Sequence, residues 1–383
     1  MLRYALKMLI GDRAKYLGII LGLSFAAFII SQQAAIFVGL MSRTFGFVAD
    51  MTQANIWVMD RKVQYIDDIK PMRSTEVYRV QGIEGVEWAV PFFKGAIRAR
   101  LKEGIFQTCI LIGLDDATLI GGPPRMVQGN IESLRGPDAI IVNNVGARDK
   151  LSHDFPLSTQ PLRVGDTLEL NDQRAYVTGI CDVSRTFQSQ PVIYTTFNRA
   201  LTYVPAERKL LSFVLVKSKP GVDPELVCQK IHAVTGLTAK TSQQFKEMTV
   251  LYYLKYSGIP INFGMAVFLG FIIGIAIAGQ TFYNFTLDNL RYFATFKAMG
   301  ADTKLLTKMI LVQAFWVGAI GWGIGVGAAS AFGFLFAKTE LSFRMPWQLF
   351  LLTCFSIGLI SAFAAWLSMR KVRNLDPAIV FKS

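Results

Sequence analysis

The sequence predicts an α-helical membrane protein with four transmembrane helices plus an extracytoplasmic α/β domain, which we expect to be a split ferredoxin-like module with an inserted β-rich lobe. Three observations predict this fold class. Four long stretches without a charged residue interrupt the 383-residue chain, one near the N-terminus and three in its last third. Lysines and arginines gather at particular ends of these stretches, and residues 43–258 alternate strand-like and helix-like patterns.

The four uncharged stretches are long enough to cross a membrane. They contain 27, 32, 29 and 25 residues, whereas a helix needs roughly 20 apolar residues to span the hydrocarbon core. We therefore predict four transmembrane helices, at residues 16–42, 259–287, 305–337 and 345–369.

The first uncharged stretch follows a short amphipathic segment at residues 1–15, a position in which a secretory signal sequence also occurs. A signal core has roughly 7 to 15 apolar residues, whereas this stretch has 27 uncharged residues. Gln32 and Gln33 are followed by further apolar residues instead of a small-residue cleavage site. We therefore expect a retained helix.

Positive charges orient the predicted spans, because short loops rich in Lys and Arg stay in the cytoplasm. The segments before span one, between spans two and three, and after span four carry twelve Lys and Arg against four Asp. We expect a multi-pass protein of the inner (plasma) membrane with its N-terminus and its C-terminal tail, residues 370–383, in the cytoplasm. The net charge of +13 then reflects the topology of the chain in the membrane. A nucleic-acid-binding protein would show a basic surface with interspersed aromatic residues, and the sequence shows no such pattern.

The extracytoplasmic domain is expected over residues 43–240. Two β-α-β patterns, separated in sequence, predict a split ferredoxin-like module, and a strand-rich stretch between them predicts the inserted lobe. The elements expected in order are strand 54–59, a helix from Ser74, strand 86–90, lobe strands 138–142, 164–170 and 175–180, strand 211–216, helix 224–234 and strand 237–239.

A stalk helix is expected at residues 241–258, between this domain and the second span. Its apolar residues recur near helical spacing, and Tyr252, Tyr253 and Tyr256 suit the aromatic belt of a membrane surface. Pro260 is expected to kink or restart the helix where the span begins.

The cytoplasmic segment 288–304, between spans two and three, is the best candidate for a partner-binding element. It predicts a short helix that ends at Gly300, followed by a helix that Asp302 caps. Its apolar residues recur at three-residue intervals, which suits a helix that docks in a groove of a soluble subunit; a helix that lies on the membrane is the alternative. The predicted coupling residues are Leu290, Arg291, Phe293, Phe296, Lys297, Ala298, Met299 and Gly300.

The sequence contains no recognisable catalytic motif. There is no GxxxxGKS/T nucleotide-binding loop, the two histidines, His153 and His232, lie far apart, and no CxxC pair occurs. We therefore expect no catalytic residue, no metal site and no cofactor in this chain. Cys109 and Cys181 lie in strand-like stretches, either as small buried residues or as a disulfide.

Glycines at four-residue spacing predict close helix packing, because small residues let two helix backbones approach each other in a membrane. Gly18 and Gly22 in the first span, and Gly270 and Gly274 in the second, are expected to pack against a second copy of the chain. Ordinary packing of glycine-rich apolar helices is the alternative.

Several motifs resemble those of the FtsX-like permeases of the MacB type, a family of ABC-transporter membrane subunits. Residues 296–301, FKAMGA, resemble the family's cytoplasmic coupling motif LKAxGA, with Phe296 in place of its leucine. Residues 164–168 with 177–180 resemble its external GD and VxGI pattern, and residues 370–378 resemble its basic tail ending in Asp-Pro. The resemblance covers the whole chain, and the modest external domain is most similar to DevC and HrtB-like permeases.

The resemblance implies a homodimeric permease without an ATPase site of its own, which binds a cytoplasmic P-loop ATPase that carries ATP and Mg. It also implies contact with membrane lipid and, in Gram-negative relatives, a periplasmic adaptor protein on the external domains. We expect the chain to couple ATP hydrolysis by the partner to movement of these domains and export of a hydrophobic or amphipathic substrate. The alternative is a non-transporting mechanotransmission device that regulates an external hydrolase. Lipid, haem, peptide and small toxic compounds all remain open as cargo.

Overall fold

The chain divides into two compact units in the computed structural model, which describes residues 2–101, 104–152, 160–205, 210–337 and 339–373. A membrane unit is formed by residues 1–40 and 258–383, and a sheet unit by residues 41–257. His153 and the end of the expected tail, residues 374–383, lie outside the described residues.

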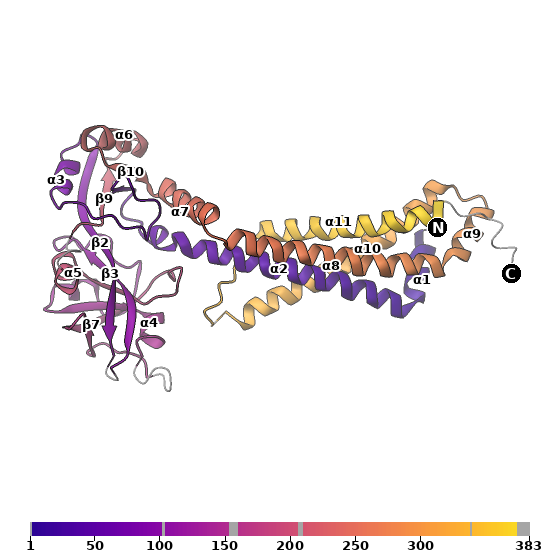
Figure 1. The fold of residues 1–383 in the computed structure, drawn as a ribbon, viewed down its shortest axis with the longest axis horizontal. Coiled ribbons are helices and arrows are strands. Elements are labelled where there is room, and N and C mark those ends of the chain that lie inside the picture. The colour runs from indigo at the N-terminus through magenta and orange to yellow at the C-terminus, as the bar shows by residue number, and fades with distance from the viewer. Residues whose placement is uncertain (1, 102–103, 153–159, 206–209, 338, 374–383) are drawn as a thin grey trace. The chain divides into compact units, whose positions relative to one another are not determined.

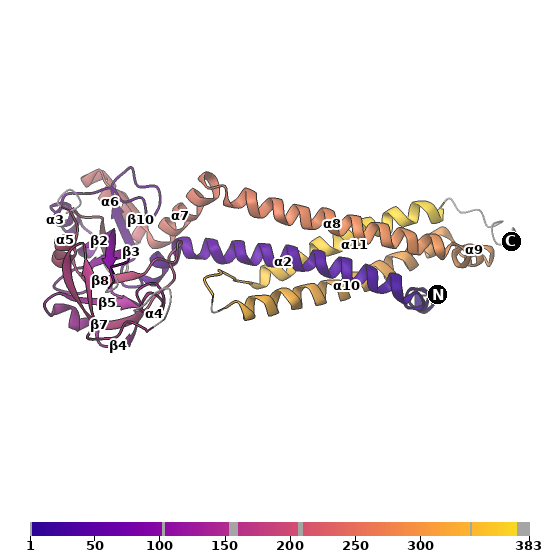
Figure 2. The same cartoon turned by 60° about the horizontal axis from the view of Figure 1, so that its bottom comes forward.

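The membrane unit is built from long helices that lie side by side (Figures 1 and 2). Four of the described helices are long and apolar enough to cross a membrane, and they correspond to the four spans that the sequence predicts. They are α2 (Arg13–Asp50), α8 (Ile259–Asp288), α10 (Thr303–Leu335) and α11 (Trp347–Arg373). Two shorter helices belong to the same unit, α1 (Leu2–Gly11) and α9 (Leu290–Ala298).

The glycines that we expected at a dimer contact pack mainly within one chain. A Cβ atom at Gly22 would overlap Ile277 of α8, and a Cβ atom at Gly274 would lie 2.7 Å from the Cβ atom of Ala26 on α2. A Cβ atom at Gly270 would lie 3.0 Å from Ile29, whereas one at Gly18 would make an ordinary contact of 3.6 Å with Thr281. Gly22, Gly270 and Gly274 therefore bring α2 and α8 of the same chain together, and the expected contact with a second copy stays a prediction.

The described strands of the sheet unit form one ten-stranded sheet, in the order β10-β1-β9-β2-β3-β8-β5-β7-β4, with β6 paired to β2 and β7. Only β3 with β8 and β5 with β7 are parallel pairs. The strands are β1 (Ile56–Met59), β2 (Val86–Arg100), β3 (Phe106–Leu114), β4 (Arg125–Gln128), β5 (Ala139–Asn143), β6 (Thr167–Leu170), β7 (Gln173–Asp182), β8 (Val192–Thr196), β9 (Phe213–Ser218) and β10 (Thr238–Thr241). The helices are α3 (Glu76–Gln81), the 3-10 helix η1 (Ile131–Arg135), α4 (Asn144–Arg148), α5 (Phe197–Tyr203), α6 (Pro224–Thr235) and α7 (Ser242–Tyr256).

The split ferredoxin-like module is confirmed by the pairing of its four strands. The units β1-α3-β2 and β9-α6-β10 interleave in the order β10-β1-β9-β2, and every neighbouring pair in this group is antiparallel. This is the strand arrangement of a β-α-β-β-α-β module whose two halves are separated in sequence.

The inserted β-rich stretch forms the expected lobe, and strand β2 joins its strands to those of the module in one continuous order of pairing. Strand β2 was expected to end at Val90 but runs to Arg100, although Pro91 and Gly95 interrupt its pattern. Its first half pairs with β9 and its second half with β3. One long strand therefore belongs to both halves of the sheet, and this long-range pairing is not visible in local residue patterns.

Both faces of the module's sheet are buried. In β1, Ile56 and Val58 belong to one hydrophobic cluster, while Trp57 and Met59 belong to the cluster on the other face. The alternation of side chains along a strand explains this division. The first cluster includes residues of α3 and α6, and the second includes the last turns of α2 and the first turns of α7.

An aromatic cluster around Trp57 joins these two helices to the sheet. The ring of Trp57 lies 6.5 Å from Phe47 of α2, 5.5 Å from Phe245 of α7, 5.9 Å from Phe92 of β2 and 5.6 Å from Phe213 of β9. Trp57, Phe92, Phe213 and Phe245 are fully buried. We call these five residues the Trp57 cluster.

Polar contacts hold the same helix ends. The backbone N–H and the hydroxyl of Ser184 each donate a hydrogen bond of 2.7 Å to the carboxylate of Asp50, the last residue of α2. Thr241 and Gln244 form a capping box at the start of α7, which occupies the region of the expected stalk helix. Tyr252 of α7 stacks on Tyr65 with ring centroids 4.2 Å apart.

Buried Lys94 adds a contact between β2, α2 and the loop after β1. Its ammonium group donates a hydrogen bond of 3.3 Å to the carbonyl of Ile66, pairs with Asp67 and lies 5.7 Å from the ring centroid of Phe47. A buried ammonium group is tolerated only with such partners.

The cysteines of the sheet unit are buried free thiols, so the alternative of a Cys109–Cys181 disulfide is not supported. Cys109 and Cys181 belong to hydrophobic clusters on different faces of the sheet. Burial raises the pKa of each of the thiols of Cys109, Cys181 and Cys228 to about 12.

We predict that Trp57→Ala lowers the free energy of unfolding by about 3–5 kcal/mol, because it leaves a cavity among four aromatic rings. Unfolding of the purified full chain in detergent, followed by circular dichroism, measures the change. Tyr78→Ala, which removes an aromatic side chain that is 74% exposed, is the matched control and should have an effect within about 0.5 kcal/mol. Equal effects of the two substitutions would contradict the role of the cluster.

A second prediction concerns thiol reactivity. At pH 8 a thiol with a pKa of about 12 stays protonated, and only the thiolate is nucleophilic. Iodoacetamide should therefore leave Cys109, Cys181 and Cys228 unmodified in the folded chain and modify all three after denaturation, as measured by peptide mass spectrometry. Rapid modification of any of them in the folded state would show that the burial is wrong.

Candidate functional site

Helix α9, the predicted coupling helix, follows α8 after the single residue Asn289. The Asn289 side-chain amide is buried and donates a hydrogen bond of 2.8 Å to the carbonyl of Phe285. One turn earlier, the hydroxyl of Thr286 donates to the carbonyl of Phe282 at 2.9 Å. These bonds use carbonyls near the end of α8 and hold the direction in which α9 leaves it.

Gly300 ends the segment as expected. Its φ of +92° is in the left-handed region that glycine adopts without strain. The Gly300 N–H donates to the carbonyl of Lys297 at 3.1 Å, and the Ala301 N–H donates to the carbonyl of Phe296 at 2.9 Å. This pair of bonds is a Schellman motif.

Asp302 occupies the N-cap position of α10, as predicted, but its side chain makes no capping hydrogen bond. Its backbone carbonyl accepts the N–H of Leu305 at 2.9 Å instead. The turn between α9 and α10 is therefore stabilised by its backbone.

The predicted apolar face of α9 divides into a buried and an exposed part. Phe293 is fully buried in the core of the membrane unit, and Leu290 and Phe296 pack against the same core. Met299, in contrast, is 65% exposed. Phe293 therefore anchors the helix to its own chain, which corrects its assignment to a groove on a partner. Phe296 is half-buried, so its contact with a partner stays a prediction.

Helix geometry explains the division. A helix advances about 100° per residue, so a three-residue step falls about 60° short of a full turn. Three such steps, from Leu290 to Met299, rotate the side-chain direction by about 180°. A period of three residues consequently cannot form one face.

The exposed face follows a different spacing. Tyr292, which is 61% exposed, is followed by exposed Thr295 and Met299 at three- and four-residue intervals. Arg291 and Ala298 flank this row and are also exposed, and Lys297 is half-buried. Tyr292 and Thr295 were missing from the predicted site, although a search for spacings of three and four residues would have found them.

An ion-pair cluster supports the entry to α9. The ammonium group of Lys15, at the start of α2, lies 2.8 Å from the carboxylate of Asp12 and pairs with Asp288 at the end of α8. The hydrogen bond from Lys15 lowers the pKa of the Asp12 carboxyl. The side-chain amide of Gln313, on α10, donates a buried hydrogen bond of 2.7 Å to the backbone carbonyl of Ala5, on α1. These contacts link α2 to the end of α8, where α9 follows, and α1 to α10.

The exposed face of α9 is suited to binding. It presents one guanidinium group, one phenol, one hydroxyl and one thioether, which can contact the surface of another protein. Within the described part of the chain, no three His, Cys, Asp or Glu side chains gather as a metal site.

The fold defines a class: a four-span membrane protein with one large α/β domain inserted after the first span. Two family models match the chain, one in its N-terminal part and one in its C-terminal part. The MacB-like periplasmic core domain matches residues 16–234, more than half of the chain, and the FtsX-like permease C-terminal domain matches residues 264–377. The chain belongs to this family of FtsX-like ABC-transporter permeases with a MacB-like core domain.

Individual relatives agree with the family. An uncharacterised ABC transporter permease of Mycobacterium tuberculosis is 23% identical over 319 residues, which cover 81% of this chain and 79% of the relative. Another, from Mycobacterium bovis, is 23% identical over 262 residues, which cover 68% of this chain and 65% of the relative.

Two solved structures are similar to about half of the chain. The periplasmic region of MacB from Actinobacillus actinomycetemcomitans has a TM-score of 0.38 and 11% identity, and covers 52% of this chain and 94% of that structure. The extracellular domain of the transporter YknZ from Gram-positive bacteria has a TM-score of 0.35 and 16% identity. The match covers 49% of this chain and 98% of that structure.

We predict that Tyr292→Asp and Met299→Asp reduce binding of the partner ATPase at least about tenfold, because either carboxylate would be desolvated in the contact. The measurement is co-purification of the ATPase with tagged permease, together with permease-dependent ATP hydrolysis. Tyr78→Asp, which places the same charge on exposed α3, is the control and should bind normally.

Phe293→Asp distinguishes the buried face from the exposed one. Because Phe293 is fully buried, we expect this variant to lose yield of folded protein in the membrane instead of losing only ATPase binding. A well-folded Phe293→Asp variant that fails to bind the ATPase, beside normal binding by Tyr292→Asp and Met299→Asp, would reverse the assignment of the two faces.

Proposed function

We propose that the chain is the membrane permease subunit of an ABC exporter, which works as a homodimer with a cytoplasmic ATPase and extrudes a hydrophobic or amphipathic substrate. The observation that carries this proposal is α9: a short helix anchored to the spans by Phe293 and ended by a Schellman motif, with an exposed row at Tyr292, Thr295 and Met299. The family of ABC-transporter permeases implies the partner ATPase.

The proposed orientation places α9 and both termini in the cytoplasm and the sheet unit outside. The excess of Lys and Arg around the start of α2, around α9 and at the end of α11 supports this orientation through the positive-inside rule. In this orientation the exposed face of α9 meets the ATPase, and ATP and Mg are bound by that partner alone.

Motion is proposed to pass through α2 and α7. Within the sheet unit, Phe47 near the end of α2 and Phe245 near the start of α7 share the buried Trp57 cluster with the sheet, and Ser184 holds Asp50 through two hydrogen bonds. A displacement of either helix end would therefore move the sheet with it. Close packing transmits such displacements because protein interiors have few voids.

A second copy is proposed to cover α8. Only 17% of the membrane window of α8 is buried in its own chain, against 39%, 50% and 56% for the other spans. Its exposed face includes Leu269 and Ile272 and also Gln280, whose amide donates to Asn284 at 3.5 Å. Polar side chains in a span usually face protein and not lipid, which favours α8 as the dimer contact.

Disulfide cross-linking tests the dimer contact. In a Cys354→Ser background, Ile272→Cys should give a disulfide-linked dimer on oxidation in membranes, because two copies of one position meet at a twofold contact. Phe355→Cys on α11, at a side chain that is 68% exposed, is the control and should remain monomeric on a non-reducing gel. The opposite pattern would move the contact to α11.

The first experiment on function is affinity purification of the tagged chain from its native membrane in mild detergent, with mass spectrometry of retained proteins. A P-loop ATPase at equal stoichiometry supports the permease, and ATP hydrolysis stimulated by hydrophobic compounds supports export. A retained external hydrolase without such stimulation would favour the mechanotransmission device. Failure to retain any ATPase under conditions that preserve the dimer would overturn the proposal.

A further inference from the structure

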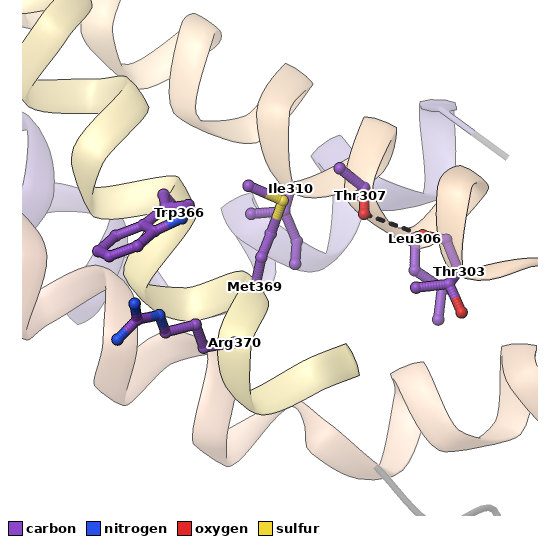
Figure 3. Close-up of a pocket in the computed structure, with 7 residues that line it drawn as sticks. All are labelled: Thr303, Leu306, Thr307, Ile310, Trp366, Met369 and Arg370. Carbon is purple, nitrogen blue, oxygen red and sulfur yellow. Dashed lines mark hydrogen bonds between the residues drawn. The ribbon is translucent and has the colours of Figure 1, made fainter. Parts of the chain in front are cut away.

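Two hollows lie between α10 and α11 of the membrane unit. The first, of 330 Å³, lies where α10 begins and α11 ends, and Figure 3 shows the seven residues that line it. The second, of 480 Å³, lies farther along the same two helices and is lined by apolar and small residues together with Cys354 and Ser361.

The two hollows are consecutive parts of one groove. On a helix, residues four apart are neighbours along one row. One row of α11 contributes Cys354, Gly358 and Ala362 to the second hollow and Trp366 and Arg370 to the first. The rows of α10 continue in the same way, with Leu306 and Ile310 in the first hollow and Ala314, Gly318 and Trp322 in the second.

The two ends of this groove differ in chemistry. At the first hollow, the guanidinium carbon of Arg370 lies 3.9 Å from the ring centroid of Trp366, a cation-π contact that holds the charge at the rim. The hydroxyl of Thr307 donates to the carbonyl of Thr303 at 2.9 Å, as Figure 3 shows. Among the residues that the structure describes, no acidic side chain lines this hollow, and Lys304, one residue from it, is exposed.

The rest of the groove is apolar and open on one side. Its floor includes Ala314 and Ile357, both buried, and its rim includes Phe315, which is 76% exposed. Trp322 uses its indole N–H within the chain, in a hydrogen bond of 3.1 Å to the hydroxyl of Thr353. A cationic end therefore continues into an apolar channel.

We propose that this groove binds one phospholipid with an anionic headgroup, whose phosphate pairs with Arg370 and whose acyl chain lies along α10 and α11. The rise from Thr303 to Trp322 is about 28 Å on a helix, long enough for a headgroup and one acyl chain. Basic pockets between spans at the cytoplasmic side are typical sites for acidic lipid headgroups. The site goes beyond the export function, and only its assignment to the inner leaflet rests on the proposed orientation.

Charge and shape together favour a lipid over other occupants. A transmembrane helix of a second copy would fill the apolar channel without needing the guanidinium group at its end. A soluble ATPase would reach Arg370 but not the channel at the depth of Gly318 and Ile357. Only an amphipathic molecule with one anionic end matches both parts.

Native mass spectrometry of the purified full chain in detergent tests the site, with dioleoylphosphatidylglycerol and dioleoylphosphatidylcholine as competing probes. We expect retention of one phosphatidylglycerol per chain in preference to phosphatidylcholine. Glycerol 3-phosphate, which carries the phosphate without acyl chains, distinguishes the two parts of the groove and should not displace the lipid at equal concentration.

Two variants probe the two ends of the groove separately. Arg370→Gln should reduce retention of phosphatidylglycerol at least about fivefold and abolish the preference over phosphatidylcholine. Gly358→Leu should reduce retention of both lipids, because a Cβ atom at Gly358 meets nothing within 4 Å and the new side chain can fill the channel.

Matched controls are Arg13→Gln, which removes an exposed cation at the start of α2, and Gly327→Leu, at a glycine that also has open space. Both should retain the lipid as the unmodified chain does, with equal elution volume and thermal stability for all variants. Normal retention in both Arg370→Gln and Gly358→Leu would overturn the proposal. Displacement by glycerol 3-phosphate alone would equally overturn it, in favour of a simple phosphate site, and a loss of dimer in Gly358→Leu with unchanged lipid retention would show that a second copy occupies the channel.

Discussion

The burial of Trp57 between the sheet and two helix ends is the constraint on which the sheet unit depends. Trp57 is fully buried and touches aromatic rings from α2, α7, β2 and β9. Without the helix ends, one face of the four-stranded module would expose a continuous apolar surface, and a sheet of this kind is stable only when such a face is covered. The hydrophobic effect therefore makes these helix ends part of the domain, and the same packing that folds the domain can transmit a displacement.

The membrane unit also depends on close packing between its elements, through a different set of residues. Glycines at positions 22, 270 and 274 let α2 and α8 approach, and Phe293 anchors the coupling helix to the core of the spans. Since helix association in a membrane depends on close van der Waals packing, these small residues are needed within one chain. What the chain leaves uncovered is then informative: the face of α8, the row from Tyr292 to Met299, and the groove between α10 and α11.

These uncovered surfaces differ in chemistry, which suggests different occupants. The α8 face is apolar with an amide pair, as expected of a contact between like helices in a membrane. The α9 row is short and mixed, as expected of a contact with a soluble protein. The groove combines the cation of Arg370 with an apolar channel, which matches a lipid. In the arrangement that we propose, a second copy, an ATPase and a lipid would contact different residues of the chain.

Local residue patterns predict the four spans, the split ferredoxin-like module, the helix α7 and the end of α9 at Gly300. The signals are uncharged length, strand and helix periodicity, and a glycine that adopts a positive φ. Long-range packing, in contrast, makes β2 run past Pro91 to join both halves of the sheet, turns Phe293 inward and Met299 outward, and packs Gly22, Gly270 and Gly274 within the chain. A local residue pattern shows that one face of an element is apolar, or that two backbones can approach each other. It does not show which element packs there, because that depends on residues far apart in the sequence.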